Sequence, residues 1–273
     1  MLNTLVIVWR ESLEAMLVIG VLLSWIARQP ERDQLRHGLW LGACAGLALA
    51  LLLGFATYAA QGQFAGRSLE IFQLVMILIA SAMMVQMVLW MHRRGRTMKR
   101  ELEAQAGRAA GAVGIGAITA LAVGREGAET VIFLYGLGLD AGGGQLARLL
   151  AAATAGFVLA AATSWIVAHG ARYLSYRTLF RVSEILLLLI ANALLANAID
   201  RMIAMDWLPP LLDPVWDISA LLNDSHGVGR FLANFVGYRS RPAGILLGAS
   251  VVFWATMLWR LARPDRSMVR GTS

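Results

Sequence analysis

The sequence predicts an all-α, polytopic membrane protein with seven transmembrane helices, arranged as two inverted three-helix repeats plus a seventh helix. Three observations lead to this prediction: an unusually apolar composition, basic residues that alternate between successive connections, and a charged motif that occurs twice. Of the 273 residues, 58% are hydrophobic and only 15% are charged, and the mean hydropathy is +0.63. A soluble domain has roughly 45–50% apolar and about 25% charged residues, so the composition indicates a membrane protein.

Seven apolar runs have about the length that a helix needs to cross the hydrocarbon core, roughly 20 residues. These runs cover residues 2–27, 38–60, 69–91, 111–137, 146–170, 182–205 and 243–262. They predict a single transmembrane domain over residues 1–273. Its expected parts are repeat one (about 1–91), repeat two (about 111–205), an outer loop (206–242) and a seventh helix (243–262).

The net charge of +7 is better explained by membrane topology than by nucleic-acid binding. Sixteen Lys and Arg residues lie in alternate connections and the C-terminal tail, against six on the opposite side. Under the positive-inside rule, this bias puts the N-terminus outside and the C-terminus in the cytoplasm. We therefore expect a multi-pass protein of the cytoplasmic (inner) membrane, in contact with the lipid bilayer and not with nucleic acid.

The first apolar run carries Arg10-Glu11-Ser12-Leu13-Glu14, and the fourth carries Arg125-Glu126-Gly127-Ala128-Glu129. Each charge near the centre of a membrane helix opposes insertion by about 2.5–3.5 kcal/mol, so three charges in one segment oppose it by roughly 8–10 kcal/mol. The charges also interrupt the apolar segment of any signal peptide, so the first helix is expected to remain in the mature protein. Residues three or four apart share a helix face, so each motif presents two carboxylates together.

The spacing of these features predicts an inverted repeat. Arg125 follows Arg10 by 115 residues, and Glu184 follows Glu70 by 114. An odd number of helices in each copy inserts the second copy upside down. Inverted repeats with binding residues near the membrane midplane are typical of secondary transporters.

Two such motifs meeting at the midplane would bring together four carboxylates and two guanidiniums. Carboxylate oxygens suit hard or borderline cations such as iron or manganese, and the arginines would stabilise the empty site. Glu11, Glu14, Glu126 and Glu129 are thus candidate metal ligands, with Arg10 and Arg125 as supporting charges. The alternative is a pair of structural ion pairs, which the repetition of the motif disfavours.

Several polar residues outside the motifs are candidate accessory ligands: Glu70, Gln73, Glu184, Asp217, Asp224 and His226. In the outer loop, Asp213-Pro214 predicts the start of one short helix and Asn223-Asp224-Ser225 the start of a second. Gly237 predicts the end of the second helix. Capping explains Asp213 and Asp224 as well as metal binding does.

Arg-Glu-x-x-Glu in the first and fourth of seven spans resembles the oxidase-dependent iron permeases, which include the fungal high-affinity and the bacterial EfeU-type permeases. The segments 89–91, 216–220 and 235–238 also resemble the bacterial branch. The resemblance implies a permease that takes up iron, as Fe2+ or Fe3+, across the cytoplasmic membrane, with the motif glutamates as ligands. It also implies periplasmic iron-binding or oxidase partner proteins.

The chain departs from the family pattern at a few positions. Ser12 stands where the motif usually has glycine, Ala128 where it has leucine, and Gln73 where the bacterial branch tends to have glutamate. A permease for manganese or lead is the alternative, because spacing does not select the ion. An intramembrane enzyme is disfavoured, because the sequence contains neither His-Glu-x-x-His nor Gly-x-Ser-x-Gly. No permanently bound cofactor is expected.

Overall fold

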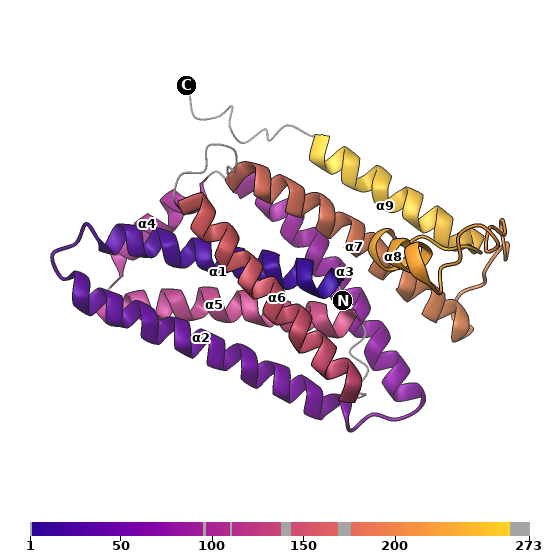
Figure 1. The fold of residues 1–273 in the computed structure, drawn as a ribbon, viewed down its shortest axis with the longest axis horizontal. Helices are drawn as coiled ribbons and strands as arrows, with labels where there is room; N and C mark the ends of the chain where they lie inside the picture. The colour runs from indigo at the N-terminus through magenta and orange to yellow at the C-terminus, as the bar shows by residue number, and fades with distance from the viewer. Residues whose placement is uncertain (1, 95–96, 110, 138–142, 169–175, 263–273) are drawn as a thin grey trace. The chain divides into compact units, whose positions relative to one another are not determined.

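The computed structural model describes residues 2–94, 97–109, 111–137, 143–168 and 176–262. Within these ranges the chain is all-helical, with nine α-helices and no strand (Figure 1). The helices are α1 (Leu2–Ile26), α2 (Arg32–Gln61), α3 (Arg67–Arg94), α4 (Met98–Arg108), α5 (Gly111–Gly136), α6 (Gly143–Ala168), α7 (Tyr176–Ala204), α8 (Gly227–Val236) and α9 (Gly244–Ala262).

Each of the seven predicted apolar runs coincides with one of these helices. Among the described residues, five helices are long and apolar enough to cross a membrane: α2, α3, α6, α7 and α9. The other two, α1 and α5, are 25 and 26 residues long, but each contains the three charged residues of its motif. The two helices that remain, α4 and α8, have only 11 and 10 residues, too few to cross the hydrocarbon core.

The chain divides into two compact units. The first comprises residues 1–76 and 97–183, and the second comprises residues 77–96 and 184–273. Both charged motifs belong to the first unit.

In the first unit, α2 and α5 run parallel and pack backbone against backbone. A Cβ atom built on Gly38 would meet Ala112 O at 2.2 Å, and one built on Gly42 would meet Gly116 O at 2.1 Å. Since Gly38 and Gly42 are four apart, they repeat on one helix face. Small residues on such a face allow two helices to approach closely.

We expect Gly42→Ala to destabilise the protein by about 1–3 kcal/mol, because the added methyl group would overlap the carbonyl of Gly116. The matched control is Gly20→Ala in α1, where a Cβ would meet nothing within 4 Å. That control should be neutral or stabilising by up to about 1 kcal/mol, because alanine favours the helix. Thermal unfolding of the detergent-purified variants tests this pair, and equal melting temperatures would contradict it.

The helix α1 packs against α5 and α6. Its second half forms an apolar cluster with the starts of α2 and α5 and with α4, so α1 and α5 run antiparallel (Figure 1). The buried members of this cluster are Val18, Leu22, Ile26, Leu35, Leu39, Leu102, Ala106 and Ile115. Against α6, α1 runs parallel: Gly156 lies against Leu5 O, and Trp9 Nε1 donates a hydrogen bond to Thr163 Oγ1 at 3.2 Å.

The second unit is built on α7. Ser81 Oγ on α3 donates a hydrogen bond to Ala191 O, and the start of α9 packs on Ala196 and Ile199 through Leu246. The helix α8 ends at Gly237, which has φ 83° and closes the helix through its backbone N–H, as predicted. Asn192 Nδ2 donates to Val236 O next to this turn, so the end of α8 is held against α7.

One predicted helix of the outer loop was wrong, and the other begins later than predicted. No helix follows Asp213-Pro214, because the backbone N–H groups of Val215 and Ile218 donate instead to Pro242 O and Ser240 O. These long-range bonds satisfy groups that a helix would have satisfied locally. The second helix begins only after His226. Before it, Asn223 Oδ1 accepts hydrogen bonds from the backbone N–H and the hydroxyl group of Ser225, and these bonds close a separate turn.

We expect Arg239→Gln to open the outer loop. Arg239 is 15% exposed, and its guanidinium pairs with Asp200 Oδ2 at 2.6 Å and donates to Asn197 Oδ1 on α7. A hydrogen bond to a charged group contributes about 1.5–3 kcal/mol, so proteolysis within residues 206–242 should be about tenfold faster. Arg241→Gln is the matched control, because Arg241 is 63% exposed and exposed pairs contribute little. Similar cleavage rates for both variants would contradict the prediction.

Candidate metal centre

The first motif lies in the buried face of α1. Arg10 is only 1% exposed, and its guanidinium pairs with Glu11 Oε1 at 2.8 Å and with Glu14 Oε1. The two carboxylates are three residues apart, so they stand one above the other on this face. One buried guanidinium therefore holds both glutamates of its own motif.

The second motif lies on α5, and its arginine has a different environment. The Arg125 side chain is 50% exposed, and its Nε donates to Glu129 Oε1 at 2.7 Å. Gly127, between the two glutamates, lies against α2, where an added Cβ would come within 2.3 Å of Ala50 Cβ. The glycine inside the motif thus lets α2 approach the charged segment closely. The first motif has Ser12 at the equivalent place.

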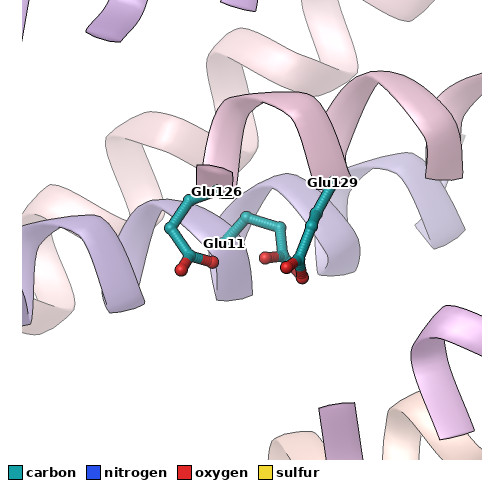
Figure 2. Close-up of side chains that lie close together, drawn as sticks. All are labelled: Glu11, Glu126 and Glu129. Atoms are coloured by element: carbon teal, nitrogen blue, oxygen red, sulfur yellow. The ribbon is translucent and has the colours of Figure 1, made fainter. Parts of the chain in front are cut away.

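The two motifs meet through Glu11, Glu126 and Glu129. One carboxyl oxygen from each of these residues lies within 4.8 Å of the other two, and all three residues are buried. Figure 2 shows the carboxyl groups of Glu126 and Glu129 pointing from α5 to the side where the carboxyl group of Glu11 lies. Of the four carboxylates that the sequence predicts to face one another, the structure brings these three close together, whereas Glu14 pairs with Arg10.

Two oxygens of this group are available to a ligand. Within the described part of the chain, Glu11 Oε2 and Glu126 Oε2 are buried and have no hydrogen-bond partner. A buried carboxylate oxygen without a partner is destabilising, and a cation placed between the three groups would satisfy it. Three carboxylates at this spacing can bind a hard or borderline divalent cation.

The accessory candidates of the first unit lie apart from this group. Glu70 is exposed in the first turn of α3, so it is not brought to the cluster. Gln73 lines a pocket of about 340 Å³ at the α2–α3 turn. The residues that line it are Tyr58, Ala59, Gln61, Gly62, Phe64, Leu69 and Gln73. None of these is an acid or a histidine, so the pocket lacks the charged ligands of the cluster.

The accessory candidates of the second unit have other partners. Glu184 lies on α7 and His92 on α3, and Glu184 Oε2 is 3.9 Å from His92 Nδ1. Asp217 pairs with Arg241 at 2.7 Å, and the Arg241 and Ser219 hydrogen bonds lower the pKa of this carboxyl well below its ordinary value. Asp224 Oδ2 accepts a hydrogen bond from the Ser240 backbone at 3.2 Å.

His226 stands exposed at the N-terminus of α8 and makes no capping hydrogen bond with its side chain. The outer-loop acids thus have partners within the loop, and the structure does not join them with His226 into a metal cluster within the described residues. Their pairing with Arg241 and Ser240 connects positions 16 to 24 residues apart, which local sequence patterns do not reveal.

Sequence reasoning missed two contacts that position the charged helices. Ala50 against Gly127 sets the approach of α2 to the second motif, and the Trp9–Thr163 hydrogen bond fixes α1 on α6 beside the first motif. A glycine between two charged residues was the signal for the former contact. The tryptophan directly before Arg10 was a weaker signal for the latter.

Comparison with known proteins identifies the family of the chain. The Iron permease FTR1 family matches residues 1–262. Ferrous iron permease EfeU of Yersinia pestis is 26% identical over 274 residues, which cover 96% of this chain and 93% of that protein. Ferrous iron permease EfeU of Escherichia coli O6:H1 is 27% identical over 272 residues, covering 96% of this chain and 95% of that protein. No solved structure matches the chain. The chain therefore belongs to the Iron permease FTR1 family and is a membrane permease, not an enzyme.

Proposed function

We propose that this permease carries iron as Fe2+ across the cytoplasmic membrane, with Glu11, Glu126 and Glu129 binding the ion near the membrane midplane. The observation that supports this most directly is the approach of three buried carboxylates, from both charged motifs, to within 4.8 Å. Relatives that match along nearly the whole chain carry the name ferrous iron permease. Iron is the transported substrate here and not a resident cofactor.

Charge balance favours the ferrous ion. The two motifs contribute four glutamates and two arginines, which sum to a formal charge of minus two. A divalent ion neutralises this sum, whereas a trivalent ion leaves a net positive charge in a region where uncompensated charge is strongly destabilising.

The proposal includes seven spans, with the N-terminus outside, the C-terminus in the cytoplasm, and two inverted repeats. The antiparallel pair α1 and α5 supports it, because inverted copies of one helix must run in opposite directions. In the proposed repeat, α2 corresponds to α6 and α5 corresponds to α1. The α2–α5 pair is therefore equivalent to the α6–α1 pair, and both pairs run parallel with a glycine at the contact. In the bilayer, exposed apolar side chains on α2 such as Leu41, Leu51 and Phe55 would face lipid.

Transport by the purified chain in liposomes tests the proposal. Anaerobic Fe2+ uptake, measured with and without a proton gradient, should be saturable and should compete weakly with Mn2+ and Pb2+. Preferential uptake of Mn2+ or Pb2+ would assign a different metal, and absence of metal uptake would overturn the proposal. Periplasmic iron-binding or oxidase proteins are proposed partners, and their addition should raise the uptake rate without changing the ion selected.

A further inference from the structure

The two charged motifs are related by the repeat but are in different states in this structure. In the first, Arg10 is almost completely buried and pairs with both glutamates. In the second, Arg125 is half exposed and pairs with Glu129, and Glu126 Oε2 has no hydrogen-bond partner within the described residues. Side chains with the same sequence pattern therefore differ in burial and in pairing.

The four carboxylates are arranged in order along the helix axes. Each helix rises about 1.5 Å per residue, so Glu129 lies about 4.5 Å along α5 from Glu126, and Glu14 about 4.5 Å along α1 from Glu11. Because α1 and α5 run antiparallel, these two displacements point in opposite directions. Glu11 and Glu126 form the middle of a row about 9 Å long, with Glu129 at one end and Glu14 at the other.

We propose that Glu129 and Glu14 serve in turn as the third ligand of the ion, and that the one withheld from the ion is the one whose arginine is buried and bridges both glutamates of its own motif. This inference rests on the proposed function. In the state seen here, the ion binds Glu11, Glu126 and Glu129, and Arg10 keeps Glu14 away from it. In the opposite state the motifs exchange their arrangements, so Arg125 becomes buried and pairs with Glu126 and Glu129. Arg10 then loosens, and the ion binds Glu11, Glu126 and Glu14.

The exchange moves the ion along the row without leaving it unliganded, because Glu11 and Glu126 are common to both states. The charge within the row stays the same throughout, because the four glutamates, the two arginines and the ion are present in both states. Both states contain the same side chains in equivalent roles, so their free energies can lie close together, as a transport cycle requires. Under the proposed topology, Glu129 lies toward the outside and Glu14 toward the cytoplasm.

The test separates binding from transport in two isosteric variants, Glu129→Gln and Glu14→Gln. Fe2+ binding is measured anaerobically by equilibrium dialysis of the detergent-purified full chain, and uptake is measured in liposomes. We expect Glu129→Gln to raise the Kd for Fe2+ at least tenfold, whereas Glu14→Gln leaves it within about threefold. Uptake should fall to background in both variants.

Equal loss of Fe2+ binding in the two variants would overturn the inference, because it would indicate one fixed site of four ligands. Normal uptake by Glu14→Gln would overturn it as well. If Glu14→Gln accumulates poorly, the charge-neutral variant Arg10→Gln/Glu14→Gln replaces it, with the same expected binding and loss of uptake. The proposed function fails by a different result, namely no Fe2+ uptake by the unaltered chain or normal uptake by Glu126→Gln.

Discussion

Glu126→Gln is expected to reduce Fe2+ uptake at least 100-fold while the folded protein becomes more stable in the absence of iron. Glu126 is buried, and its Oε2 has no hydrogen-bond partner among the described residues. A charge near the centre of the membrane opposes insertion by about 2.5–3.5 kcal/mol, so the neutral amide removes an unfavourable term. The same change removes a charged ligand from the centre of the row. Function and stability should thus change in opposite directions.

Two measurements check this prediction: anaerobic Fe2+ uptake in liposomes and the thermal midpoint of the iron-free protein in detergent. A gain of 1 kcal/mol corresponds to about 2–4 °C for a chain of this size. Glu70→Gln is the control, because Glu70 is exposed at the start of α3 and lies apart from the cluster. In the control, the uptake rate should change by no more than about twofold and the thermal midpoint by no more than about 1 °C. A less stable Glu126→Gln variant with normal uptake would contradict the assignment of Glu126.

The sequence predicted the helices and the meeting of the motifs because both depend on regular spacing. The apolar runs match the helices, since runs of about 20 apolar residues leave few other folds in a bilayer. The repeat offset predicted that Arg10 and Arg125 begin equivalent segments, and the structure brings Glu11 close to Glu126 and Glu129.

The pairing of individual charges could not be predicted in the same way. Two glutamates three apart share a helix face whether they bind a metal, a neighbouring helix or their own arginine. Glu14 pairs with Arg10, whose guanidinium is buried beside it, and sequence spacing contains no measure of this burial. Asp213-Pro214 failed as a helix start for a related reason, because the bonds of Val215 and Ile218 come from residues 240–242.

Packing against α2 and α6 positions the two charged motifs. Gly127 brings the α2 backbone close to the second motif, and Trp9 ties the first motif to α6. Both contacts position the carboxylates through helices and not through loops, which keeps a binding site rigid. The proposed exchange between the arrangements of the two charged motifs must then move α1 and α5 as whole helices, or move only the side chains of the motifs.

Arg10 is predicted to be the charged residue whose loss damages the fold most. It is 1% exposed, and its guanidinium lies between Glu11 and Glu14. Removing one partner of a buried ion pair destabilises a protein by about 3–5 kcal/mol, because the other charge is left uncompensated. Here two carboxylates would lose their cation together. Arg125 has the same place in its motif, but its side chain is half exposed, so less of the fold is packed around it.

Arg10→Gln should therefore reduce the yield of folded, monodisperse protein at least tenfold, whereas Arg125→Gln should leave the yield within about twofold. The double variant Arg10→Gln/Glu14→Gln should recover much of the folded protein, because it removes one unpaired carboxylate along with the guanidinium. Fluorescence-detected size-exclusion chromatography of the three variants, expressed in parallel, measures this directly. Equal yields for the two single variants would show that the two arginines are equivalent, and would contradict the difference in burial on which the proposed exchange depends.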